Sequence, residues 1–115
     1  MAITIRPKVV YITGDVTDEE SRRIITEAED ALRHRGFCVL NAARMPAGLP
    51  AAKRFLLGKA CIEAADAVLF TATDFDSEMV KAEDIHSYQI FATAIHLSSK
   101  VSLETAVKWI EEVTR

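Results

Sequence analysis

Glu83 is the residue of this sequence whose type and surroundings are best suited to chemistry. Met79 lies one helical turn before it, and His86 and Ile90 follow at about one and two turns. In a helix this spacing places Glu83 among apolar neighbours, which keep a carboxylate partly dry and rigid. Such a carboxylate can serve as a nucleophile or as a general base. The alternative is an amphipathic helix on which the run of charges around Glu83 faces the solvent.

Polar residues also follow the short apolar runs that we expect to be strands. Hydroxyl groups at helix N-termini can bind an anionic ligand, because free backbone N–H groups and the helix dipole add to them. The alternative is that these residues only cap helices, as Ser, Thr and Asp do in most proteins. The candidate residues at this edge are Thr13, Thr17, Asn41, Ser77, Ser98 and Ser99.

Motifs for cofactors are absent from the sequence. It has neither G-x-G-x-x-G nor G-x-x-x-x-G-K, which argues against dinucleotide and P-loop sites. His34, His86 and His96 lack metal-ligand spacing with one another or with the cysteines. We therefore expect no cofactor and no metal.

Hydrophobic periodicity predicts four strands that alternate with four helices. The strands are expected at residues 8–12, 37–40, 67–71 and 95–97. A capping box from Thr17 to Glu20 is expected to begin the first helix, and Gly36 to end it. Pro50 and Ser102 are expected to begin the second and fourth helices, and the third runs from residue 78 to about 92.

This alternation predicts an α/β fold of the flavodoxin-like or Rossmann-like type. We expect a doubly wound parallel sheet of four to five strands in the order 2-1-3-4, with helices on both faces in three layers. In such folds ligands bind at the carboxyl ends of the strands. The polar residues above and the start of the Glu83 helix are expected to meet there.

Composition narrows the class of protein. The chain has 115 residues, of which 50% are hydrophobic and 27% charged, with a net charge of -3. We expect one domain over residues 1–115, without a basic field for a nucleic-acid polymer and without a membrane span. Cys38 and Cys61 lie in apolar stretches and are expected to be buried free thiols. Together with the lack of an apolar signal core, they predict a cytoplasmic protein.

Several segments resemble those of a known family. Residues 9–14, Val-Val-Tyr-Ile-Thr-Gly, with Thr17, resemble the Y-I-S/T-G-x-x-T opening of the nucleoside 2-deoxyribosyltransferase-like superfamily, and most closely a small branch common in phage genomes. Residues 36–41 are similar to its G-x-x-V-x-N segment. Asp66 matches the Asp of an L-x-x-C/A-D-A segment, and Ser77 and Glu83 follow it by the family's eleven and seventeen residues.

The resemblance implies activity on the N-glycosidic bond of a (deoxy)nucleoside or its monophosphate, by glycosyl transfer or hydrolysis. It implies that Glu83 is the nucleophile and forms a covalent glycosyl-enzyme. It also implies a small-molecule nucleoside or nucleotide as partner and a homo-oligomer, a dimer or larger. The residues that it places around the nucleoside are Tyr11, Thr13, Gly14, Asn41 and Ser77.

Departures from the family pattern keep other functions open. Met79 and Val80 replace a Gly-Ala pair, so Met79 is expected to fill part of the pocket, and Gly58 stands where many members carry an Asp. One alternative is a catalytically lapsed module that binds or sequesters a nucleotide. Another is a purely structural or oligomerising domain, which would use helix faces with residues such as Phe55, Leu56 and Trp109.

Overall fold

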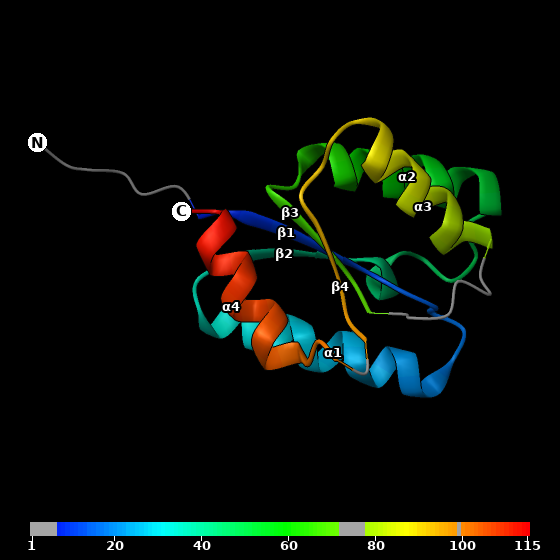
Figure 1. Cartoon of the computed structure of the whole chain (residues 1–115). Helices are drawn as coiled ribbons and strands as arrows, with labels where there is room; N and C mark the ends of the chain where they lie inside the picture. The colour runs from blue at the N-terminus through cyan, green and yellow to red at the C-terminus, as the bar shows by residue number, and fades with distance from the viewer. Residues whose placement is uncertain (1–6, 72–77, 99) are drawn as a thin grey trace, which may run out of the picture.

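The computed structural model of the chain describes residues 7–71, 78–98 and 100–115. Strands and helices alternate along the described chain (Figure 1). The strands are β1 (Val9–Thr13), β2 (Cys38–Asn41), β3 (Ala67–Phe70) and β4 (Ala94–His96). The helices are α1 (Glu19–His34), the short 3₁₀ helix η1 (Ala42–Arg44), α2 (Ala51–Ala64), α3 (Glu78–Gln89) and α4 (Leu103–Val113).

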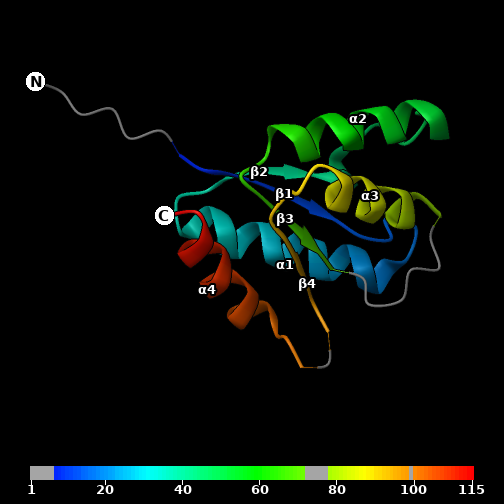
Figure 2. The same ribbon diagram turned by 45° about the horizontal axis from the view of Figure 1, so that its top comes forward.

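The four strands form one parallel sheet in the order β2-β1-β3-β4. Helices α1 and α4 cover one face and α2 and α3 the other, which the turned view also shows (Figure 2). This confirms the predicted three-layer α/β fold and its strand order. The sheet therefore has a carboxyl edge, at which the chain leaves β1 after Thr13 and β3 after Phe70.

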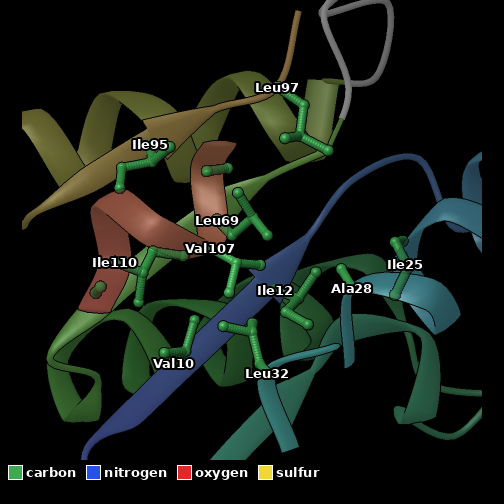
Figure 3. Close-up of a cluster of buried hydrophobic side chains, with 12 residues drawn as sticks. Val10, Ile12, Ile25, Ala28, Leu32, Leu69, Ile95, Leu97, Val107 and Ile110 are labelled. Carbon is green, nitrogen blue, oxygen red and sulfur yellow. The ribbon is translucent and has the colours of Figure 1, made fainter. Parts of the chain in front are cut away.

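Side chains of the central strands are buried on both faces of the sheet. Val10 and Ile12 of β1 point to the α1 and α4 side, where they pack in the larger apolar cluster (Figure 3). Tyr11, between them, belongs to the cluster beneath α2 and α3. Successive residues of a strand face opposite sides, so Tyr11 and Thr13 share the α2 and α3 side. This alternation determines which β1 residues can reach α3.

The first helix is capped one residue later than the sequence pattern predicts. Asp18 is the N-cap of α1, and its Oδ2 accepts a hydrogen bond from the Ser21 N–H at 3.0 Å. The predicted capping by Thr17 is wrong, because the Thr17 hydroxyl donates to Asp15 Oδ1 at 2.6 Å instead. Both Asp18 and Thr17 are good capping types, and the turn made by Asp15 decides between them.

The third helix ends three residues before its predicted boundary. Phe91 has φ of 57°, in the left-handed region that usually takes glycine. The Ala92 N–H donates to the Ser87 carbonyl, and the Phe91 N–H to the Tyr88 carbonyl, as in a Schellman motif. The apolar pattern through Ala92 gives no sign of this turn, because Phe is an uncommon residue at that position.

The edge position of β2 changes the burial expected for a cysteine. Cys38 is exposed and Cys61 half-buried, and both are free thiols. The prediction that both are buried is wrong for Cys38, because β2 has a neighbouring strand on one side only. Among the described helices, none combines the length and the apolar character that crossing a bilayer requires.

Replacing Asp18 by alanine should destabilise the protein by about 1 kcal/mol, the usual cost of losing an N-cap side chain. Urea unfolding followed by far-UV circular dichroism measures this cost. Thr17→Ala is the matched control and should cost less, because it removes no helix cap. A larger loss for Thr17→Ala than for Asp18→Ala would contradict the assignment of the cap.

Candidate functional site

The carboxylate of Glu83 is buried between α3 and the sheet, with 2% of the residue exposed. The Tyr11 hydroxyl donates to its Oε2 at 2.6 Å, and the Thr13 hydroxyl donates to its Oε1 at 2.7 Å. Each oxygen therefore has its own donor. Both donors come from β1 because residues two apart on a strand face the same side. Glu83 does not face the solvent, so the amphipathic alternative is wrong.

Helix α2 passes directly over this carboxylate at Gly58. A Cβ atom at position 58 would lie 2.6 Å from Glu83 Oε2 and 3.4 Å from the Tyr11 hydroxyl. A side chain there would require the carboxylate to move. Glycine at this position therefore allows α2 and α3 to pack closely while the Glu83 side chain lies between them.

Burial dominates the electrostatics of the site. It raises the pKa of Glu83 above its ordinary value of 4.5, while hydrogen bonds from Tyr11 and Thr13 and the charge of Arg54 act in the opposite direction. Burial, and then the charge of Glu83, raise the pKa of Tyr11 far above its usual value. Tyr11 therefore remains a neutral donor at any physiological pH.

A small cavity of about 20 Å³ lies beside the carboxylate. That is room for about one water molecule. A groove of about 360 Å³ adjoins it and shares four lining residues with it: Gly14, Val16, Arg54 and Met79. Glu83 lines the cavity but not the groove. Met79 is one of these four residues, so it lies at the boundary between the cavity and the larger space, one helical turn before Glu83.

The loop from β2 to α2 closes one side of the cavity. It contributes Ala42 and Met45 to the lining. Arg44 anchors the loop to α1, where its Nε donates to Oε1 of the buried Glu29 at 2.8 Å. The Arg44 guanidinium lowers the pKa of Glu29, so this pair is charged at neutral pH.

The structure gathers some of the predicted site residues and separates others. Tyr11, Thr13, Gly14 and Glu83 line the cavity, and Thr17 lines the adjoining groove. These residues come from β1, the turn after it and α3, as the sheet topology predicts. Ser77 and Ser99 lie outside the described residues.

Asn41 and Ser98 do not line the cavity or its groove and serve local structure instead. The Asn41 side chain accepts a hydrogen bond from the Ala43 N–H at 2.8 Å and caps η1. Ser98 Oγ accepts from the N–H groups of Lys100 and Val101. Ser98 also lines a separate hollow of about 330 Å³ against α1 and the start of α4. Asn41 therefore fits the capping alternative, whereas Ser98 hydrogen-bonds within the loop before α4, whose N-cap is Ser102.

Two residues of α2, Arg54 and Gly58, belong to the site. Arg54 was not predicted from the sequence, and position 58 was singled out only by the resemblance, as the place where many members carry an Asp. They are four residues apart and so lie on one face of the helix. The Arg54 guanidinium donates to the Pro46 carbonyl at 3.2 Å and lines both the cavity and the groove. The pair Arg-x-x-x-Gly was a possible signal, but only the packing of α2 on α3 shows that it faces Glu83.

Two histidines attach α3 to its surroundings. His86 Nε2 lies 3.2 Å from Glu63 Oε1 on α2, and His96 Nε2 lies 2.9 Å from Asp84 Oδ1 on α3. The His96 ring also stacks on Phe70 at 4.7 Å between centroids. Within the described ranges, no group of three or more His, Cys, Asp or Glu side chains is placed to hold a metal ion.

Comparison with known proteins gives one match. The model of a family described as a domain of unknown function (DUF4406) matches residues 8–90. These residues include all the described side chains that line the cavity. No curated protein and no solved structure matches the chain.

The stability of Glu83→Gln relative to the wild type should increase as the pH rises from acid to neutral. Because burial raises the folded pKa above 4.5, Glu83 contributes most to stability below that pH, and this contribution is lost as the pH rises through the folded pKa. The amide keeps the shape of the side chain and cannot ionise. The free energy of unfolding of the variant, minus that of the wild type, should increase between about pH 4 and about pH 7.

Urea denaturation at a series of pH values measures this difference. Glu78→Gln is the control for the substitution itself, since it makes the same change at an exposed residue at the start of the same helix. A flat profile for Glu83→Gln would show that burial does not perturb the Glu83 carboxyl.

Proposed function

We propose that this chain, which belongs to the DUF4406 family, cleaves the N-glycosidic bond of a (deoxy)nucleoside or its monophosphate with Glu83 as nucleophile. One observation carries the proposal: a buried carboxylate at the carboxyl edge of the sheet has a hydroxyl donor on each oxygen. The resemblance of the sequence to nucleoside 2-deoxyribosyltransferases supports the same chemistry.

The hydrogen bonds of Glu83 suit a nucleophile. Each carboxylate oxygen offers two lone pairs and accepts one hydrogen bond from the described residues, so a lone pair remains for an electrophilic carbon. Tyr11 and Thr13 fix the orientation of the carboxylate. Burial disfavours the ionised carboxylate relative to a neutral ester, which favours attack on the sugar.

The adjoining groove has the volume of a small-molecule site, for which about 300 Å³ is the lower limit. Val16 and Leu49 offer apolar surface for a nucleobase. Asp15 offers a carboxylate to sugar hydroxyls, and Arg54 offers a positive charge to a 5′-phosphate. This arrangement supports a nucleoside or nucleotide that lies along the groove with its sugar next to Met79.

The reaction then takes two steps. A Glu83 oxygen bonds to the anomeric carbon as the C–N bond breaks, and the bond electrons leave with the base, which takes a proton from solvent. Water next attacks the same carbon, the ester bond breaks back to the carboxylate, and the water loses one proton to solvent. A second base in place of water gives transfer rather than hydrolysis.

Met79 must move for this chemistry, because the cavity at Glu83 is far smaller than a sugar. Its side chain has three rotatable bonds and can turn away without a backbone change. The narrow cavity favours a second candidate function, in which the groove binds a nucleotide that Glu83 never attacks.

We also propose that the protein works in the cytoplasm on small molecules. The exposed free thiol of Cys38 is typical of a reducing compartment. The net charge of -3 disfavours a nucleic-acid polymer as partner.

Glu83→Ala should abolish base release from the wild-type substrate. Incubation with a panel of deoxynucleosides and their 5′-monophosphates, followed by chromatography, detects the free base. Loss of the nucleophile should lower the rate by roughly three orders of magnitude or more. Asp84→Asn is the control at the next position, outside the cavity lining, and should retain the rate.

Thermal denaturation with the same panel separates the two candidate functions. A ligand that raises the melting temperature of the wild type without giving product would support binding alone. An unchanged rate in Glu83→Ala would overturn the nucleophile. Neither product nor any shift across the panel would overturn both functions.

Met79→Ala should increase kcat/KM, because it joins the cavity at Glu83 to the groove. Steady-state kinetics with the best substrate of the panel measures this. Met45→Ala is the matched control: Met45 lines the cavity but not the groove, so its removal opens no path. An equal effect of the two variants would show that Met79 is not the barrier.

A further inference from the structure

A buried carboxylate of α1 holds the loop between β2 and α2. Glu29 has 1% of its surface exposed. Arg44 donates from Nε to Glu29 Oε1 at 2.8 Å and from Nη2 to Oε2 at 2.5 Å. Arg33, on the same helix as Glu29, lies further away, with its Nη2 3.5 Å from Oε1. Arg44 is therefore the main partner of Glu29, and the bidentate pair ties the loop to α1 beside the edge strand β2.

Both ends of η1 contact Glu29. Hydrogen bonds from Arg44 and from the Asn41 side chain lower the pKa of Glu29, while burial acts in the opposite direction. Asn41 is the N-cap of η1, and Arg44 is its last residue. A single turn of 3₁₀ helix has little stability of its own, so its position depends on such contacts. Glu29 therefore fixes η1 relative to α1, although Glu29 lines neither the cavity nor the groove.

The chain that follows η1 is stiff as far as the Pro46 carbonyl. Met45 is extended, with φ of -66° and ψ of 147°, as a residue before proline prefers. The proline ring then restricts φ of Pro46. The Pro46 carbonyl accepts the Leu49 N–H at 3.2 Å, which closes a turn and fixes the direction of the carbonyl. The position of η1 therefore determines the position of this carbonyl.

Arg54 is the last member of this series of contacts. Its Nη2 donates to the Pro46 carbonyl at 3.2 Å, and Arg54 lines both the cavity and the groove. A guanidinium has several N–H donors, so one bond to a carbonyl does not prevent it from binding a phosphate. The bond to Pro46 restricts the rotamers of Arg54 before any ligand arrives. Binding then costs less conformational entropy.

We propose that Glu29 is a positioning residue that, through η1 and the Pro46 carbonyl, holds the Arg54 guanidinium in place for a 5′-phosphate. This role rests on the proposed function, in which Arg54 binds that phosphate. Without the pair of Glu29 and Arg44, η1 and Pro46 can shift, and the ligand must order Arg54 at a cost in affinity. A nucleoside without a phosphate does not bear this cost, because only the phosphate contacts Arg54.

Isothermal titration calorimetry with the common deoxynucleoside 5′-monophosphates and their deoxynucleosides tests this role. Every protein carries Glu83→Gln, which keeps the shape of the side chain and prevents attack on the probe. In this background, Glu29→Gln should raise the dissociation constant of the monophosphate about tenfold and that of the nucleoside by about twofold or less. Arg54→Gln should weaken monophosphate binding at least as much.

The double variant separates positioning from general stability. Adding Glu29→Gln to Arg54→Gln should not weaken monophosphate binding further, because Glu29 acts through Arg54 alone. Arg44→Gln breaks the same pair from its exposed side and should reproduce Glu29→Gln, even where that variant folds poorly. Glu27→Gln is the control on the same helix, since Glu27 pairs with Arg23 at the surface, and it should bind both probes like the background.

The outcomes distinguish this role from the proposed reaction. Equal losses or no loss for the two probes in Glu29→Gln, or additive losses in the double variant, would overturn the role of Glu29. Base release by the wild type would still support the reaction in that case. Selective loss of monophosphate binding, in a chain whose wild type releases no base, would support the role of Glu29 and overturn the reaction. A background protein that binds the two probes equally, or binds neither, would also overturn the role.

Discussion

The site depends on the hydrogen bonds that offset the cost of burying a carboxylate. Removing an ionised carboxylate from water costs several kcal/mol, and hydrogen bonds to charged groups return about 1.5–3 kcal/mol each. Tyr11 and Thr13 supply two such bonds to Glu83. Because both come from alternate positions of one rigid strand, the carboxylate is fixed relative to the sheet rather than to a loop. Carboxylates that are buried at such a cost in free energy are typical of functional sites.

The two faces of the sheet differ in what they bury. The side covered by α1 and α4 is an apolar core in which Val10 and Ile12 meet side chains of both helices. The other side carries Glu83 among the buried apolar residues of the smaller cluster. Alternation along β1 lets a single strand serve both sides. The free energy gained by burying the larger apolar core can therefore offset the free energy needed to bury the Glu83 carboxylate.

The sequence predicted the fold well, because strand and helix periods differ and parallel crossovers allow few topologies. Strand order predicted that Thr13 and the start of the Glu83 helix meet, and the family resemblance added Tyr11 to them. The sequence did not place Asn41 and Ser98, whose side chains accept hydrogen bonds from nearby backbone N–H groups and line neither the cavity nor its groove. A single polar residue after a strand gives the same sequence pattern whether its side chain binds a ligand or accepts a hydrogen bond from a nearby backbone N–H. Contacts between helices, such as that of Gly58 with the carboxylate, depend on packing that no local pattern encodes.

The contact at Gly58 also constrains how this site can diverge. The Glu83 carboxylate fills the space that a side chain at position 58 would need, since a Cβ there would lie 2.6 Å from Glu83 Oε2. A relative with an acidic residue at 58 must therefore turn its glutamate to another rotamer or separate the two helices. Positions 58 and 83 should consequently change together during evolution, with the glycine inherited wherever the carboxylate keeps this pose.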